Sequence, residues 1–410
     1  MRKSLLFVMA VLCSITLSAK KPEKAQWTPE QAREWWAKTE WPVGCCYVPT
    51  YAVNQFEMWQ EETFNPEILD KEMALCEELG FNIVRIYLHE ELWFQDKEGF
   101  KKRIDQMLTI AGNHGVRVTF TFCTNGGGTE KLGKQPDPIP GEHGGGHWCQ
   151  SPGKDIFFNK GRWPEFKEYL QDILKTFRND SRIVYWCLYN EPENIKDGRD
   201  CLEFMTEMYK WAWEIRPSQP LTSPIWQRPG YRGNTTKLDM ISFVCENSDI
   251  LTFHCYYTAA ELEIFIKMLS RYKRPMVCQE YLGRNFGSLF ETCLPVLKRE
   301  KVGALNWGLA EGKCEYRYPW GHKLEDGEPD VWFHSIFWHD YTPYSPVEVE
   351  LVKKITADKT VAGEKAKYNI YNVVMAYIIW RPSSWLSFCI NSVRCMNRSL
   401  RRTEDLMRTR

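Results

Sequence analysis

Two glutamates each end a strand-like run of apolar residues. Glu191 closes such a run within WCLYNEPEN, residues 186–194, where Pro192 cannot donate a hydrogen bond to a sheet and so helps to end the strand. Glu280 closes a second run, VCQEYLG. Two carboxylates on one rim can divide the work: one protonates a leaving oxygen, and the other attacks carbon or activates water. The pair is therefore suited to hydrolysis of a glycosidic bond.

Four further residues lie in similar runs and could complete a site. Arg85 is inside an apolar run, where an unpaired charge would be costly, so we expect a buried carboxylate partner. His254 and Tyr256 alternate onto one face of their run and can donate hydrogen bonds. Trp307 ends another run and could form the floor of a sugar site. Taken singly, each residue is more typical of a core side chain whose hydrogen bonds are made within the fold. The hypothesis of a shared site depends on all four together with the two glutamates.

Apolar runs and amphipathic stretches of helical period alternate along the chain. Residues 65–80 are typical of a helix, because Asn65 can cap it, Pro66 suits its first turn and Gly80 can end it. Eight runs are predicted to be strands: 43–52, 82–89, 117–123, 182–191, 220–226 (the weakest), 250–257, 275–281 and 302–309. Alternating units favour a parallel sheet, and eight of them favour an α/β fold, the (β/α)8 TIM barrel. A doubly wound open sheet is the alternative, but the glycine loop that it needs after its first strand is missing.

Two connections that follow strands are long. Residues 124–162 are rich in glycine and proline, and residues 310–345 are rich in aromatic side chains. In a TIM barrel, connections of this kind build the site at the carboxyl ends of the strands. His143 and His147 lie four apart in the first connection, but in a glycine-rich loop, so loop polarity or a sugar contact is favoured over a zinc site.

The composition narrows the class of partner. The chain has 53 basic and 53 acidic residues, which argues against nucleic acid or an anionic membrane held by charge. Its 18 Trp, 19 Tyr and 21 Phe indicate either a large aromatic core or a surface for stacking sugars. Of the 15 cysteines, all but Cys13 follow residue 19, without the spacing of zinc ligands. Many lie in apolar runs, which predicts buried thiols.

The two ends of the chain differ from its middle. Residues 1–19 are typical of a secretory signal peptide, with basic Arg2 and Lys3, a short apolar core and small residues before the cleavage point. Residues 20–360 are expected to form the catalytic barrel, and residues 361–410 an appendage of unknown role. We therefore expect a protein that is secreted, periplasmic or held at the cell surface.

The order of these residues on the strands resembles a known family. Arg85, Asn190–Glu191–Pro192, His254-x-Tyr256, Glu280 and Trp307 together resemble the clan A glycoside hydrolases, most of all family 5, over about residues 40–345. The resemblance implies a retaining β-glycosidase without metal or cofactor, acting on a β-linked polysaccharide or oligosaccharide (mannan, glucan or xylan). It implies no nucleic-acid partner and no obligate protein partner.

The resemblance also implies roles for single residues. Glu191 would be the acid/base and Glu280 the nucleophile. Asn190 would bind the sugar 2-hydroxyl, and Arg85 and Tyr256 would hold Glu280. The family tends to have a histidine at the end of strand three, where this chain has TFCTN. His89, on the same face as Arg85, is expected to fill that role.

The hypothesis predicts opposite pKa shifts for the two glutamates. Arg85 should lower the pKa of Glu280, whereas partial desolvation and the charge of Glu280 should raise the pKa of Glu191. Retention requires carboxyls about 5–5.5 Å apart, against roughly 6.5–9.5 Å for inversion. Two other classes stay open, namely a non-catalytic carbohydrate-binding barrel and a transglycosylase with the same residues.

Overall fold

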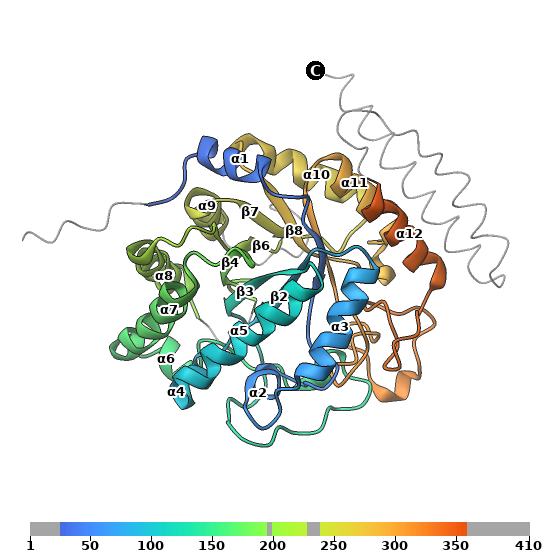
Figure 1. The fold of residues 1–410 in the computed structure, drawn as a ribbon, viewed down its shortest axis with the longest axis horizontal. Coiled ribbons are helices and arrows are strands. Elements are labelled where there is room, and N and C mark those ends of the chain that lie inside the picture. The colour runs from blue at the N-terminus through green and yellow to red at the C-terminus, as the bar shows by residue number, and fades with distance from the viewer. Residues whose placement is uncertain (1–24, 195–198, 228–237, 359–410) are drawn as a thin grey trace, which may run out of the picture. The chain divides into compact units, whose positions relative to one another are not determined.

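The computed structural model of the chain describes residues 25–194, 199–227 and 238–358 (Figure 1). These residues belong to the first of two compact units, Met1–Lys359; the second begins at Thr360. The predicted signal peptide and the predicted appendage both lie outside the described residues. Within those residues, no helix has the length and apolar character needed to cross a membrane.

A parallel sheet forms the centre of the unit. Its strands are β1 (Val43–Cys46), β2 (Ile83–Tyr87), β3 (Arg117–Cys123), β4 (Ile183–Tyr189), β5 (Leu221–Thr222), β6 (Pro224–Ile225), β7 (Leu251–His254), β8 (Met276–Tyr281) and β9 (Gly303–Trp307). They are ordered β5-β4-β3-β2-β1-β9-β8-β7-β6, so β1 pairs with both β2 and β9. The two end strands, β5 and β6, are consecutive in the chain, and the sheet therefore curls into a nearly closed barrel. The predicted (β/α)8 class is confirmed.

The fifth predicted strand, 220–226, differs from the prediction, because the structure divides it around Ser223 into β5 and β6. Pro224 has no backbone N–H for a ladder. The Ser223 hydroxyl instead accepts a hydrogen bond from the backbone N–H of Tyr189, at 3.3 Å. A side chain thus replaces part of the backbone pairing, and β5 and β6 together occupy one of the eight barrel positions.

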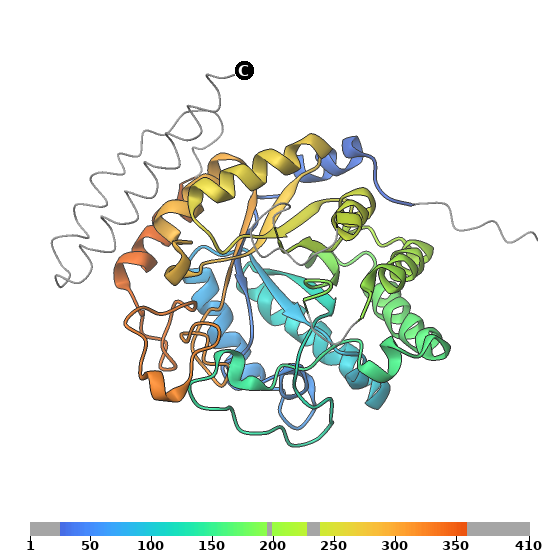
Figure 2. The same cartoon turned by 180° about the vertical axis from the view of Figure 1, so that it is seen from behind.

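Helices surround the barrel (Figures 1 and 2). The helices are α1 (Pro29–Ala37), α2 (Gln55–Trp59), α3 (Pro66–Glu78), α4 (Glu90–Gln95), α5 (Lys97–Asn113), α6 (Lys154–Phe157), α7 (Trp163–Phe177), α8 (Cys201–Ile215), α9 (Leu238–Asn247), α10 (Ala259–Leu269), α11 (Phe290–Arg299) and α12 (Pro346–Ala357). Short 3-10 turns are η1 (His143–Gly146), η2 (Lys160–Arg162), η3 (Ser270–Tyr272), η4 (Arg284–Phe286) and η5 (Leu324–Asp326).

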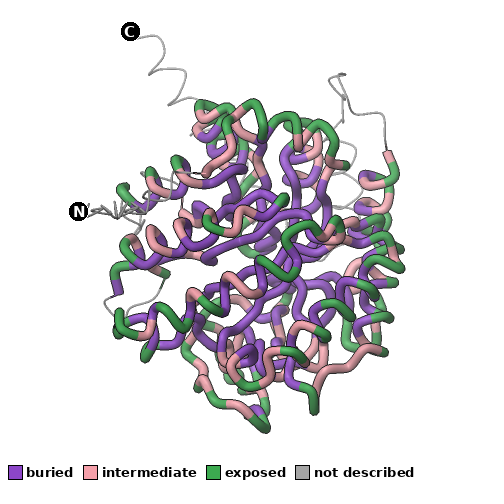
Figure 3. The backbone as a smooth tube through the Cα atoms, turned by 60° about the vertical axis from the view of Figure 1, so that its left-hand side comes forward, coloured by how far each residue is buried: buried purple, intermediate pink, exposed green. Residues whose placement is uncertain are grey.

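The helix predicted at 65–80 shows how local sequence sets these elements. The Asn65 side chain accepts the N–H of Ile68, and Pro66 occupies the first turn of α3. Leu69 and Met73 are buried on one face of the helix. This face packs inward, as do the apolar faces of its neighbours, so the buried residues concentrate in the strands and inner helix faces (Figure 3). All 12 cysteines among the described residues are free and buried, which confirms the prediction of buried thiols there.

Candidate active site

The end of β4 places two neighbouring side chains on one side of the chain. Strict alternation would send Asn190 and Glu191 to opposite faces of the sheet. The strand ends at Tyr189, and Glu191 has a left-handed backbone with φ of 44°. Backbone of this kind is uncommon for a residue with a side chain and is held in place by its surroundings. The turn brings both Asn190 and Glu191 into contact with the same group of barrel residues.

Glu280 lies in β8, and its donors include one arginine and two tyrosines. Arg85 Nη1 lies 2.6 Å from its Oε1, and the Tyr87 hydroxyl is 3.3 Å from the same oxygen. The Tyr256 hydroxyl donates to Oε2 at 2.8 Å. Glu280 is 3 % exposed, so these contacts replace most of its hydration. The carboxylate that Arg85 was expected to require is Glu280.

Arg85 connects Glu280 with the end of β4. Its Nη2 donates to Asn190 Oδ1 at 2.6 Å, and its Nε donates to the Thr121 hydroxyl at 2.9 Å. The side chain is fully buried, and its guanidinium carbon lies 4.8 Å from the centre of the Tyr87 ring. One cation therefore holds together residues of β2, β3 and β8 and Asn190, which directly follows β4.

His254 lies between the two glutamates. Its Nδ1 is 2.7 Å from Glu191 Oε1 and 3.2 Å from Glu280 Oε2. Burial lowers the pKa of His254 to about 3, so its imidazole is neutral near pH 7. Because acceptor oxygens of both glutamates face Nδ1, we assign the ring proton to this nitrogen, which donates hydrogen bonds to them.

The two carboxyls titrate in a largely desolvated space. Burial raises the pKa of Glu191 to about 7, although the Asn194 amide and the charge of Arg85 oppose the rise. Burial also raises the pKa of Glu280 and outweighs the opposing effect of Arg85. Arg85 does lower the pKa of Glu280, as expected, but removing the carboxylate from water raises this pKa by more, so the net shift is upward.

Trp307 and His89 have different positions. Trp307 ends β9, is partly buried, and its ring lies 6.2 Å from the ring of Tyr87, which contacts Glu280. His89 is fully buried: its Nε2 faces the Gln150 carbonyl at 2.8 Å, and its Nδ1 accepts the N–H of Glu91 at the start of α4. Both ring nitrogens of His89 thus serve the fold, and the structure does not bring them to the glutamates.

Three contact residues were not predicted from the sequence. Tyr87 is a strand-end neighbour of Arg85 and contacts Glu280. Asn125 follows β3 and donates to the backbone carbonyl of Glu191 at 2.7 Å. Asn194 donates to Glu191 Oε2 at 2.5 Å. The sequence did carry a signal for Asn125, because it stands in TFCTN, at the strand end where a polar residue was sought and where no histidine is found.

Metal ligation can also be assessed from the geometry. One atom each from Glu191, His254 and Glu280 lies within 4.8 Å of the others, which is a spacing that a cation could use. In the long loop, His143 Nδ1 faces the Tyr318 carbonyl at 2.8 Å, and His147 Nε2 faces the Asp137 carbonyl at 3.0 Å. The two loop histidines therefore bond to different backbone carbonyls.

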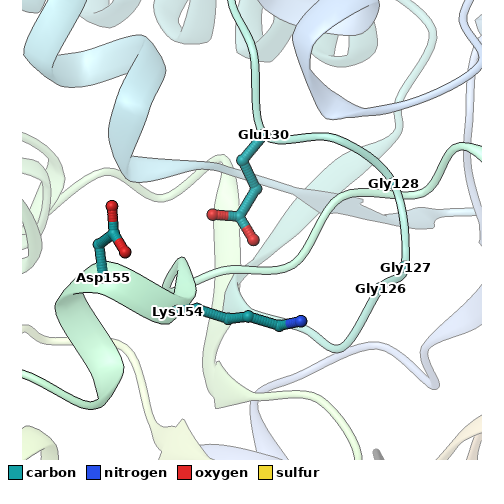
Figure 4. Close-up of a pocket in the computed structure, with 6 residues that line it drawn as sticks. All are labelled: Gly126, Gly127, Gly128, Glu130, Lys154 and Asp155. Carbon is teal, nitrogen blue, oxygen red and sulfur yellow. The ribbon is translucent and has the colours of Figure 1, made fainter. Parts of the chain in front are cut away.

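A small hollow lies on the loop that follows β3. Glu130 and Lys154 reach into it from two sides, with glycines 126–128 along its edge and Asp155 nearby (Figure 4). Burial raises the pKa of Glu130 to about 7. The volume is about 230 Å³, below the roughly 300–1,000 Å³ of ordinary ligand pockets. Neither Glu191 nor Glu280 lines the hollow, so the paired carboxylates remain the centre of the site.

Comparison with known proteins gives a result only at the level of structure. No family model matches the sequence, and no curated protein matches it. The endo-β-1,4-mannanase of Thermotoga petrophila is 15% identical, with a TM-score of 0.51, over 78% of this chain and 77% of that one. The GH5_18 protein of Streptomyces cattleya, solved with Manβ1-4GlcNAc, is 13% identical, with a TM-score of 0.56, over 79% and 82%.

A third similar structure is the exo-β-1,4-mannosidase of Opitutaceae bacterium strain TAV5. It is 16% identical, with a TM-score of 0.52, over 77% of this chain and 59% of that one. Identities this low establish the fold and leave the activity to the site itself. The chain thus has the fold of the barrel glycoside hydrolases that its sequence resembles.

Proposed function

We propose that the protein is a retaining β-glycoside hydrolase. The observation that carries the proposal is the pair of carboxylates at the ends of β4 and β8, with His254 between them. One carboxylate oxygen of Glu191 lies within 4.8 Å of one carboxylate oxygen of Glu280. This spacing favours retention, which uses carboxyls about 5–5.5 Å apart, over inversion, which leaves roughly 6.5–9.5 Å for a water.

The contacts support one assignment of roles. Glu280 receives the Arg85 guanidinium and two tyrosine hydroxyls, all of which stabilise a negative charge. Glu191, whose side chain is 17 % exposed, lies beside a neutral imidazole, and its pKa is raised to about 7. A proton shared by the pair therefore resides preferentially on Glu191. Glu280 is the nucleophile, and Glu191 is the acid and then the base.

The reaction has two displacements. The Glu280 carboxylate attacks the anomeric carbon while Glu191 delivers its proton to the departing oxygen, which leaves a glycosyl ester on Glu280. Glu191, now ionised, takes a proton from water, and that water attacks the anomeric carbon and releases Glu280. Tyr256 and Arg85 stabilise the negative charge of Glu280 before the attack and again when Glu280 is released. Neither side chain needs to move, because both are buried and already oriented.

The comparisons support one substrate class as part of the proposal. Similar structures include a β-1,4-mannanase, a β-1,4-mannosidase and a protein bound to Manβ1-4GlcNAc. We infer β-mannosidic bonds as the first class to test, with β-glucan and xylan as the comparison substrates. The protein acts after export, as its first 19 residues indicate.

Product stereochemistry provides the test. The purified protein is incubated with aryl β-mannoside, β-glucoside and β-xyloside and with the matching polysaccharides, and NMR follows the first anomer released. Release of the β-anomer supports the proposal, whereas release of the α-anomer would contradict retention. Products elongated on added acceptor sugars would identify a transglycosylase. Binding without any cleavage would identify a non-catalytic barrel.

A further inference from the structure

A continuous set of rings leads from Glu280 to the protein surface. Tyr256 donates its hydroxyl to Glu280, and its ring centre lies 5.2 Å from that of Trp320. Trp320 in turn lies 5.6 Å from Phe286, with the two planes tilted by 38°. The ring of Phe333 packs behind both, 4.8 Å from Trp320 and 5.5 Å from Phe286. The rings come from three separate segments, which follow β7, β8 and β9.

Only the outer rings of this set are open to water. Phe333 is fully buried and Tyr256 is 8 % exposed, whereas Trp320 is 51 % exposed and Phe286 is 44 % exposed. Exposing two large rings side by side forgoes the stabilisation that burial of each would give. Contiguous exposed apolar area of this kind marks a binding surface more often than single exposed residues do.

The backing of the two rings is rigid. Arg284, two residues before Phe286, donates to the His334 carbonyl at 2.7 Å and to the Ser335 carbonyl at 2.9 Å. It also forms a buried ion pair with Glu348 of α12, at 2.6 Å. Arg284 thus ties η4, which carries Phe286, to the segment that carries Phe333, and Trp320 packs against the rings of Phe286, Phe333 and Tyr256, so both outer rings have partners before any ligand arrives. Such preorganisation lowers the entropy lost on binding.

We propose that Trp320 and Phe286 form a stacking subsite for a sugar of the substrate other than the one that reacts. The inference rests on the proposed glycosidase function. A pyranose ring has a face of C–H groups that can be buried on an aromatic ring while its hydroxyls remain in water. Neither Trp320 nor Phe286 carries a charge, which suits a neutral glycan. The ring of Trp320 contacts Tyr256, which donates to the nucleophile. A sugar stacked on Trp320 would therefore be adjacent to the reacting sugar.

The subsite predicts a dependence on substrate length. Trp320→Ala and Phe286→Ala should leave kcat/KM for the aryl monoglycoside within about twofold of wild type. The same variants should lower kcat/KM for the oligosaccharide that the wild type cleaves best by about tenfold or more, the effect expected when the apolar contact between one ring and the sugar is lost. Trp320→Phe keeps a ring and should recover most of that loss.

A matched control is present on the same long loop. Trp338 is 38 % exposed and packs against Trp332, at 4.4 Å, rather than against Tyr256. Trp338→Ala should leave both substrates unaffected. Equal losses on the aryl monoglycoside and the oligosaccharide for Trp320→Ala would show a merely structural role and overturn the subsite. Unchanged kinetics on every substrate would overturn it as well.

A binding measurement separates this inference from the proposed function. In Glu280→Ala, calorimetry measures the Kd for β-1,4-linked manno-, gluco- and xylo-oligosaccharides from the disaccharide to the hexasaccharide. Affinity should rise with length, and adding Trp320→Ala should remove at least about tenfold of that rise. If the wild type cleaves nothing yet Trp320 still sets the length dependence, the stacking subsite stands while the hydrolase proposal fails. If length has no effect on Kd, the subsite itself is wrong.

Discussion

The Arg85 guanidinium lies 2.6 Å from the Glu280 carboxylate, although 195 positions separate the two residues in the chain. The same guanidinium reaches Asn190 at an equal distance, so both strand ends that carry the paired glutamates depend on it. The ion pair is almost completely buried, with side-chain exposures of 0% and 4%. A buried pair of this kind adds little net stability when intact, and breaking it is costly, because one charge is left without a partner.

The first prediction concerns this pair. Arg85→Met should abolish measurable hydrolysis and lower the free energy of unfolding by about 3–5 kcal/mol. Adding Glu280→Gln removes the stranded carboxylate and should return part of the lost stability without restoring activity. Urea unfolding of the two single variants and the double variant measures the coupling. Strictly additive losses would contradict the interpretation that the penalty arises from an unpaired charge.

The second prediction separates the two glutamates. Glu280→Ala removes the nucleophile and should severely impair every substrate. Glu191→Ala removes the proton donor, which matters most for a poor leaving group, so the first step on an activated aryl glycoside should survive far better than polysaccharide cleavage. Azide should then restore turnover of Glu191→Ala and give a β-azide product, identified by NMR. A β-azide product from Glu280→Ala instead would mean that the two roles are reversed.

The third prediction concerns pH. Glu191 acts as an acid only while protonated, and burial raises its pKa to about 7, so kcat should fall as the pH rises through about 7. The Asn194 amide donates to the Glu191 carboxylate and favours its ionised form. Asn194→Ala should therefore raise this pKa and move the alkaline limb of the pH–rate profile upward. Asn113→Ala, at an exposed site at the end of α5, serves as the control and should leave the profile in place. A downward shift for Asn194→Ala would contradict the assignment of that limb to Glu191.

The fourth prediction concerns residues 361–410. Helix α12 ends at Ala357, and Lys298 of α11 donates to the backbone carbonyls of Ile355 and Asp358. A protein ending at Asp358 keeps these contacts and should retain full activity and a cooperative unfolding transition. Calorimetry and kinetics on the shortened chain check this. Loss of solubility or activity, with the full chain intact, would place a structural role in the removed residues.

The fifth prediction concerns export. The mature protein should begin close to Lys20, because the basic, apolar and small-residue segments of a signal peptide end at Ala19. Mass spectrometry of secreted material measures the new N-terminus. Exported protein that retains Met1 would contradict cleavage.

The barrel and the place of the two glutamates could be predicted because strand periodicity and strand ends are local properties. Arg85 could be predicted to need a carboxylate from its apolar surroundings alone. The division of the fifth strand could not be predicted, because it depends on a hydrogen bond that the Ser223 hydroxyl accepts from a backbone N–H 34 positions away. The net direction of the Glu280 pKa also could not be predicted, because it depends on how completely the barrel excludes water. The contact between Trp320 and Phe286 could not be predicted either. It depends on the conformations of two loops, and loops have no sequence periodicity from which a conformation could be predicted.

The buried thiols have a consequence for how long the protein lasts in an oxidising environment. Twelve cysteines of the described residues are buried without disulfides, in a chain expected to meet an oxidising environment. As long as the barrel is closed, oxidants cannot reach them. Once it opens, the exposed thiols can form mixed disulfides and cross-link neighbouring chains faster than the barrel re-forms. The working lifetime of the enzyme is therefore set by its rate of unfolding, and heat inactivation should be irreversible in air but partly reversible with a reductant present.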